Sequence, residues 1–320
     1  MKWWPLIKVL PVRTHAHFVR LARVFAAISL LLVAASLVGA FYPGFSLGID
    51  FKGGTILELS TVKPVDLAVV RGTLNRMNLG DVQVQTFAAK DDPQSQRHVS
   101  VQFQMPKDRD ASGVVTQVKQ QLDQALGQVS YSKTEVVGPK VSGELFSKGL
   151  IALGVAILCM LVYIWFRFEL QFGLGAVAAL FHDVILTFGM ILVLRIELDL
   201  TLIAAILTVI GYSMNDTVVV FDRLRENLRK YKRMPLGEVI DLSINETLTR
   251  TVITGVTALL ALSGLAIFGG AALRDFSLVL MFGIAIGTYS SIYIASPIVL
   301  LWGLKRNEDV EIITPQGARP

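Results

Sequence analysis

The chain alternates between long uncharged stretches and short charged ones. Uncharged runs cover residues 24–49, 149–166, 251–273 and 276–304, and the runs 170–194 and 200–221 each contain a single acid. A helix needs about 20 apolar residues to cross the hydrocarbon core of a bilayer. The pattern therefore predicts a polytopic α-helical membrane protein with six transmembrane helices. We place these helices at 24–41, 149–166, 170–194, 199–221, 247–270 and 276–304.

The first apolar run also has features of a secretory signal peptide. Its uncharged part, residues 24–49, is longer than the usual apolar core of about 7 to 15 residues in such peptides. Cleavage after Ala40 is the alternative, and we favour a retained membrane anchor.

The periodicity changes in the segment 42–148. Strand patterns occur at 55–60, 82–88, 99–105 and 129–137, and helical spacing occurs at 64–78 and 111–126. The order is βαββαβ, which predicts one ferredoxin-like α+β extracytoplasmic domain. Such a fold implies no function by itself. The segment contains no catalytic cluster, so we expect a binding or force-transmitting module.

Basic residues orient the predicted bundle. They gather before residue 24, in the loop 222–246 and at the start of the tail 305–320. Loops rich in Lys and Arg stay on the cytoplasmic side of a membrane. The segment 1–23, this loop and the tail are therefore expected in the cytoplasm, with both termini inside and the 42–148 domain outside.

Composition narrows the class of protein. The chain is 53% hydrophobic and 17% charged, with a net charge of +5, whereas a soluble chain carries about 25% charged residues. This excludes a purely soluble globular enzyme, a disordered protein and a nucleic-acid-binding domain. Cys159 is the single cysteine, so no disulfide within the chain and no Cys/His metal site is expected. We expect no enzymatic activity, no metal and no organic cofactor.

Few charged residues fall at membrane depth, where a charge costs several kcal/mol and marks a functional site by default. Asp216 lies about 9 Å from the centre of its span and Arg250 about 12 Å from the centre of the next, on the same side. A carboxylate facing a guanidinium at this depth is a sensible pair. We predict a proton-binding site whose pairing changes during transport. A static ion pair that locks two helices is the alternative.

Other polar residues accompany this pair. Tyr212, Ser213, Asn215, Thr247 and Thr254 are auxiliary polar candidates beside it. His182 and Asp183 lie near the centre of the third span. They either extend a proton path or form a local polar pair that fixes helix packing, and the sequence leaves both interpretations open.

Small residues mark the last span. Gly283 and Gly287 have GxxxG spacing, and Ser290, Ser291 and Ser296 follow. The pattern favours close helix packing within the bundle, with a contact between subunits as the alternative.

Several long motifs resemble the SecDF family of protein-export membrane proteins, within the resistance-nodulation-division superfamily. They are GIDFKGGT at 48–55, VGPKVSGEL at 137–145, ALFHDV at 179–184, IGYSMNDTVVVFDRLREN at 210–227, SINETLTRT at 243–251 and RDFSLVLMFGIAIGTYSSIYIASP at 274–297. The motifs follow the family's order over nearly the whole chain.

The resemblance implies proton-driven assistance to protein export at the bacterial inner membrane, in a late step that does not depend on SecA. The family's essential intramembrane acid corresponds to Asp216 and its essential arginine to Arg250. His182 and Asp183 correspond only as motif positions. The coupling ion would be the proton, with no other cofactor.

The resemblance also implies partners. These are SecD, the SecYEG channel, the ATPase SecA, the membrane proteins YajC and YidC, the translocating preprotein and membrane lipid, but no nucleic acid. Six spans are half of a complete unit of this superfamily. SecD on another chain is therefore expected to supply a further acid and the larger outer domain.

Three rival functions remain at this point. An exporter of small molecules or lipids would favour a larger outer domain and twelve spans. An intramembrane aspartyl protease would use Asp183 and Asp216 close enough to share a proton, but its GxGD motif is absent. A passive scaffold for SecD would tolerate neutralisation of Asp216.

Overall fold

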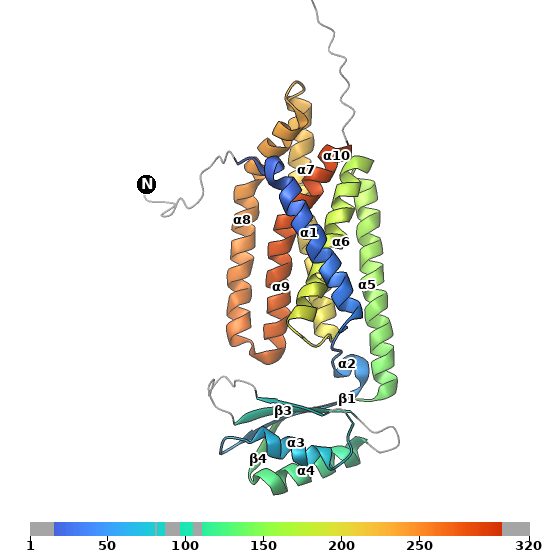
Figure 1. Ribbon diagram of the computed structural model, residues 1–320, viewed down its shortest axis with the longest axis vertical. Helices are drawn as coiled ribbons and strands as arrows, with labels where there is room; N and C mark the ends of the chain where they lie inside the picture. The colour runs from blue at the N-terminus through green and yellow to red at the C-terminus, as the bar shows by residue number, and fades with distance from the viewer. Residues whose placement is uncertain (1–15, 81, 87–96, 105–110, 303–320) are drawn as a thin grey trace, which may run out of the picture.

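The computed structural model describes residues 16–80, 82–86, 97–104 and 111–302, which form a helical bundle and a small α/β domain at one end of it (Figure 1). Residues 1–15 and 303–320 lie outside the described residues. They include the parts of the N-terminal segment and the tail that the charge pattern assigns to the cytoplasm.

Six helices in the described residues are long and apolar enough to cross a membrane, which confirms the predicted architecture. Five of them are α1 (Phe18–Phe41), α5 (Pro139–Arg167), α6 (Leu170–Val193), α7 (Leu200–Lys230) and α8 (Leu236–Phe268). The sixth runs from Leu273 to Trp302 through α9 (Gly270–Ser290), the π-helical turn η1 (Ser291–Ala295) and α10 (Ser296–Trp302).

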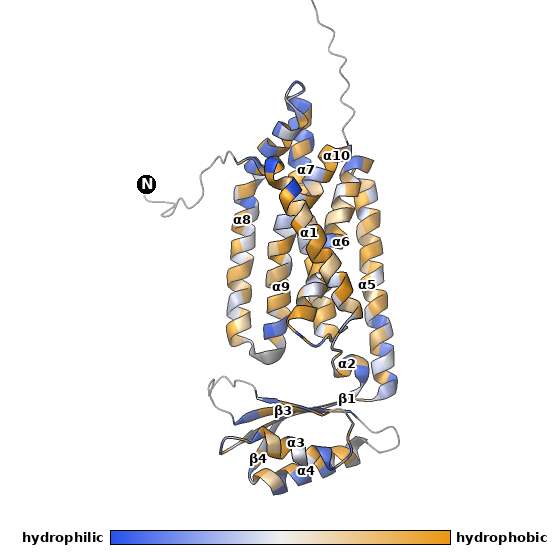
Figure 2. Ribbon diagram, in the orientation of Figure 1, coloured by the Kyte–Doolittle hydropathy of each residue, from blue (hydrophilic) through white to orange (hydrophobic). Residues whose placement is uncertain are grey.

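Several helices run beyond the uncharged stretches used to place the spans. α5 begins at Pro139 and α8 at Leu236, and α7 continues to Lys230. Nothing in these charged flanks stops a helix, because polar side chains with good helical propensity extend it into water. Hydrophilic residues consequently cover the α7–α8 turn, at the end of the bundle away from the domain (Figure 2).

The bundle has inner and outer helices. In α6, α7 and the Leu273–Trp302 helix, 61%, 56% and 50% of the apolar stretch is buried. The corresponding shares are 6% in α1 and 11% in both α5 and α8. Polar groups on the inner helices are therefore shielded, whereas α1, α5 and α8 offer apolar faces to lipid or to another chain.

The domain has the predicted element order. Its strands β1 (Gly54–Thr61), β2 (Val82–Thr86), β3 (His98–Phe103) and β4 (Val129–Val137) alternate with helices α3 (Leu67–Asn75) and α4 (Ala111–Leu126). The strand order is β2-β3-β1-β4 and every pair is antiparallel. The two helices cover one face of the sheet and share its apolar core (Figure 1). Residues 87–88 and 105 of the predicted strands lie outside the described residues.

A short connection fastens the domain to the bundle. We call residues 46–50 together with residues 196–200 the strap. Leu198 N–H donates to the Ser46 carbonyl at 2.7 Å, and Gly48 N–H donates to the Leu198 carbonyl at 2.9 Å. The Asp50 carboxylate accepts a hydrogen bond from Leu200 N–H, the first residue of α7, at 3.1 Å. The segment then continues through the short helix α2 (Ile49–Lys52) into β1.

The strap also contains a half-buried acid, Glu197. Burial raises the pKa of its carboxyl, and the neighbouring charges of Asp199 and Asp275 raise it further, against a hydrogen bond from Gln102 of β3 and the charge of Lys52. A carboxyl whose pKa is higher in the folded state lowers stability as pH rises above its ordinary value of 4.5.

Glu197→Gln is therefore expected to raise the thermal midpoint at neutral pH and to change it little near pH 4.5, the ordinary glutamate value. The glutamine keeps a hydrogen-bonding group for Gln102 without the charge. Thermal unfolding in detergent at the two pH values measures this. The matched control is Glu144→Gln on α5, a glutamate whose side chain is 58% exposed. Equal effects of the two changes would contradict the prediction.

Candidate functional site

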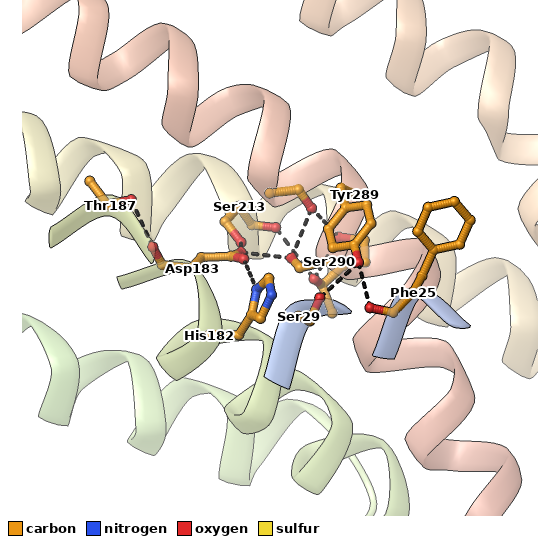
Figure 3. A network of polar contacts seen from close by, with 11 residues as sticks. Phe25, Ser29, His182, Asp183, Thr187, Ser213, Tyr289 and Ser290 are labelled. Atoms are coloured by element: carbon orange, nitrogen blue, oxygen red, sulfur yellow. Dashed lines mark hydrogen bonds and ion pairs between the residues drawn. The ribbon is translucent and has the colours of Figure 1, made fainter. Parts of the chain in front are cut away.

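The inner helices enclose a network of polar contacts centred on Asp183 of α6 (Figure 3). Asp183 is 1% exposed. His182 Nδ1 lies 2.8 Å from its Oδ1. Its Oδ2 accepts hydrogen bonds from Ser213 of α7 and from Ser290 of α9, the latter at 2.7 Å. One carboxylate thus joins three spanning helices.

Asp216 lies one helical turn from Ser213 in the same seam between α7 and α9. It is 2% exposed and accepts a hydrogen bond from Thr288 Oγ1 at 3.0 Å. Oγ1 of the next residue, Thr217, lies 2.9 Å from Oγ of Ser291, the first residue of η1. Hydroxyl groups therefore line the α7–α9 contact on both sides of Asp216.

The network reaches α1 through Tyr289. Its hydroxyl donates to the Phe25 carbonyl at 2.9 Å and lies 2.7 Å from Ser29 Oγ. Its ring stacks on the His182 imidazole with centroids 6.0 Å apart (Figure 3). Sequence reasoning missed Ser29, Thr288 and Tyr289. The consecutive polar residues of the TYSS stretch at 288–291 were the signal that could have identified the last two.

Arg250 is placed differently from the sequence-based picture of a direct pair. It is exposed on α8, and none of the ion pairs between described residues joins it to Asp216. It still lies close enough to act on Asp216 electrostatically. The sequence matched the two residues by depth alone, but a guanidinium reaches a partner only when both helix faces also point together. In this conformation, Thr288 is the hydrogen-bond partner of Asp216.

The auxiliary polar candidates do not all lie in the buried network. Ser213 belongs to the buried network, whereas the buried Tyr212 hydroxyl has no hydrogen-bond partner among the described residues. Asn215 is exposed and lines a groove beside α5. Thr247 and Thr254 donate to carbonyls of their own helix α8, Thr254 to that of Arg250 at 2.8 Å. The structure therefore keeps α8 residues out of the buried network.

Gly283 and Gly287 pack within the bundle. A Cβ added at Gly287 would lie 2.9 Å from Cβ of Ser213, and one at Gly283 would overlap the side chain of Val209. Both neighbours are on α7. The packing interpretation of the GxxxG motif is thus confirmed, and these glycines allow the two helices that hold Asp216 and Ser290 to approach closely.

Residues 117–305 match the family described as "Protein export membrane protein SecD/SecF, C-terminal", and residues 43–65 match the "SecD/SecF GG Motif". The chain belongs to the SecD/SecF family. The GG motif match covers residues 46–50 of the strap, and the longer match covers α6, α7 and α9 with all the acids of the network.

Curated relatives place this SecD/SecF family member among SecF proteins. The protein translocase subunit SecF of Cereibacter sphaeroides is 45% identical over 94% of this chain and 93% of its own length. That of Rhodobacter capsulatus is 43% identical over 95% of this chain and 93% of its own. These relatives are named as translocase subunits, and none of these matches indicates an enzymatic family.

Two solved structures of SecDF are similar in fold to this chain. The crystal structure of SecDF from Thermus thermophilus, titled a translocon-associated membrane protein, has a TM-score of 0.81 and 34% identity over 92% of this chain. A structure of SecDF in a super-membrane-facing form has a TM-score of 0.64. This SecD/SecF family member spans 39% and 40% of the length of those two chains.

Proposed function

We propose that this chain is the SecF-type subunit of a SecDF complex and assists Sec-dependent protein export by coupling proton flow to a late, SecA-independent movement of the preprotein. The similarity to SecF proteins over nearly the whole chain supports the assignment to export. The observation that carries the coupling is Asp216, an acid that is 2% exposed within a spanning helix and bonded to one hydroxyl. Acids at such depth serve proton relays in pumps and transporters.

Asp216 is the proposed proton-binding group. When its carboxylate gains a proton, it becomes neutral and can donate a hydrogen bond as well as accept one, so its bond with Thr288 is free to reverse. When the proton leaves, the buried charge needs compensation, which Arg250 on α8 would supply by moving toward it. The packing of α7, α8 and α9 then has two states, and binding of the proton determines which of them is populated.

The α7 helix would carry this change to the domain. Asp216 lies about 24 Å along the helix from its first residue, at 1.5 Å per residue. That end is held in the strap by Asp50 and by the backbone of residues 46–48. A shift of α7 would therefore move the segment that leads into β1 and turn proton binding into motion of the domain.

The positions of the basic residues indicate which end of the bundle faces the cytoplasm. Arg20 and Arg23 are near the start of α1, and Arg223 and Arg225 are near the end of α7. Both of these helix ends lie away from the domain (Figure 1). The positive-inside rule assigns that end to the cytoplasm and the domain to the periplasm of the bacterial inner membrane. This agrees with both termini being cytoplasmic.

The exposed helices are the proposed partner surface. α8 presents Arg250 and Thr254 on a face that is open in this chain, and SecD is the partner we place there. The SecYEG channel and SecA would act on the same preprotein, and YajC and YidC are further proposed partners. Protons are the coupling ion, with no metal or organic cofactor.

The test uses proteoliposomes that contain the SecYEG channel, SecA and SecD, with or without this chain. We expect the chain to speed completion of preprotein translocation only when a proton gradient is imposed. Each proton that crosses 100 mV releases about 2.3 kcal/mol, which is enough to oppose backsliding of the preprotein. An equal gain after the gradient is collapsed would favour the passive scaffold, and no gain in either condition would contradict a role in export.

A further inference from the structure

Asp183 is buried where three helices meet, and hydrogen-bonding groups contact both of its oxygens. His182 Nδ1 lies 2.8 Å from Oδ1, and Ser290 lies 2.7 Å from Oδ2, to which Ser213 also donates. A carboxyl that only accepts hydrogen bonds is in its ionised form. With Nδ1 of His182 as the donor, the arrangement is therefore that of a carboxylate.

The same atoms also satisfy a protonated Asp183. The Ser290 hydroxyl has a second acceptor, the Gly287 carbonyl, at 3.1 Å. If a proton binds Oδ2, the new O–H can donate to Ser290 Oγ while Ser290 turns its own hydrogen to Gly287. A hydroxyl donates once and accepts as well. Both protonation states are thus accommodated by rotation of one hydrogen, with no heavy atom displaced.

Charge balance points to a proton shared with His182. Among the residues that the structure describes, His182 is the basic group within ion-pair distance of Asp183. It is 6% exposed, and its other nitrogen, Nε2, is buried without a hydrogen-bond partner. A lone buried carboxylate is costly. One proton removes the net charge of the pair from either of two places, Nε2 of His182 or Oδ2 of Asp183.

No second cation lies within ion-pair distance of Asp183 among the residues that the structure describes. Tyr289 of α9 stacks on His182, and Tyr293 of η1 packs on Tyr289. On α7, Asp216 follows Ser213 by one turn, and Tyr212 precedes Asp216 by one turn. From α1, Ser29 contributes a hydroxyl to Tyr289. None of these groups carries a positive charge at neutral pH, so the charge of the pair depends on the proton itself.

We propose that His182 and Asp183 form a second proton-binding centre of this chain, separate from Asp216, in which proton arrival on Asp183 turns the Ser290 hydroxyl from Asp183 to the Gly287 carbonyl. This inference rests on the proposed proton coupling and adds a site to it. No covalent bond between heavy atoms changes. The turn reverses the hydrogen bond between α6 and α9 beside Gly287, where α9 packs closely on α7.

The experiment is infrared difference spectroscopy across a pH step, on the complex of this chain with SecD in lipid bilayers. A carboxyl that gains a proton produces a carbonyl stretch that a carboxylate lacks. We expect a band that disappears in Asp183→Asn, shifts in Ser290→Ala because its hydrogen-bond partner is lost, and persists in Asp216→Asn. His182→Phe keeps the ring over Tyr289 and is expected to change the pH at which the band appears.

Thr187→Val is the matched control. Thr187 is buried on the same helix and donates to the Asp183 carbonyl at 2.7 Å without touching the carboxylate. We expect no change in the band for this variant. We also expect about a tenfold or greater loss of proton flux in Ser290→Ala but not in Thr187→Val, because positioned proton-transfer groups contribute at least that much.

The outcomes separate the two proposals. A band that survives in Asp183→Asn, or that is the same in Ser290→Ala and wild type, would overturn the second centre and leave Asp183 as a packing residue. If Asp183→Asn fails to assemble, the band shift in Ser290→Ala decides. If the band behaves as expected but a proton gradient does not speed translocation, the second centre stands and the proposed coupling fails.

Discussion

Replacing Asp216 with asparagine is expected to abolish the part of preprotein translocation that depends on the proton gradient. Asparagine has nearly the same shape and can still accept the hydrogen bond from Thr288, but it cannot bind or release a proton. The free energy of each proton, about 2.3 kcal/mol per 100 mV, would no longer bias the preprotein. That amount corresponds to about a fifty-fold ratio of forward to backward movement. Proteoliposomes with an imposed gradient measure the loss.

The control for this change is Thr208→Val. Thr208 is on the same helix, is exposed, and donates only to the Ala204 carbonyl of its own turn. We expect it to keep the full gain. A complex that assembles with Asp216→Asn and still shows the full gradient-dependent gain would make Asp216 a structural residue. The search for the coupling acid would then move to SecD.

Gly283→Ala is expected to lower the stability of the bundle more than an added methyl group at any other glycine discussed above. Its Cβ would overlap the side chain of Val209, which is 1% exposed and branched at Cβ, so it cannot turn aside. Overpacking of this kind costs about 1–3 kcal/mol. The contact joins α7 to α9, so strain there separates the helices that hold Asp216 and Thr288. A fall in the thermal midpoint in detergent, together with loss of gradient-dependent translocation, measures the effect.

A second substitution checks the cause. Val209→Ala removes the two methyl groups that lie closest to the new Cβ and keeps Cβ of residue 209, at 3.0 Å. We expect the double variant to be more stable than Gly283→Ala alone, so the two changes would not be additive. Additive losses would mean that the glycine acts elsewhere, such as at a contact with another subunit. Gly264→Ala on α8 is the matched control, because a Cβ there meets nothing within 4 Å.

Features that depend on sequence periodicity and charge were predictable. The six spans follow from uncharged length, and the order of strands and helices in the domain follows from the change between periods of two and 3.6 residues. Gly283 and Gly287 were also correctly interpreted as packing residues, because small residues four apart favour close helix contacts. Each of these inferences uses one element and its neighbours in the chain.

The partners of the membrane acids could not be predicted in this way. Asp216 and Arg250 were matched by depth, but depth fixes only one coordinate of a residue on a helix. The direction in which the side chain points depends on how α7, α8 and α9 rotate against one another. That rotation is set by contacts such as Gly287 with Ser213, between residues far apart in the sequence. The same packing brings Ser290 to Asp183, so the sequence left the role of His182 and Asp183 open.

The strap imposes an order on the biogenesis of the molecule. Asp50 and Leu200, which it joins, are separated by 150 residues. At about 5–20 residues per second, the ribosome makes the first segment roughly 8–30 s before the second. All strands of the domain lie within residues 54–137, so its sheet can form during that interval. The short helix α2 can already pack on α5 through the rings of Phe51 and Phe146, whose centroids lie 5.4 Å apart, but the hydrogen bonds of the strap must wait until the start of α7 has been synthesised and inserted. Formation of the strap is therefore a late assembly step, and a nascent chain that stops before residue 196 would carry a folded domain that lacks its connection to α7.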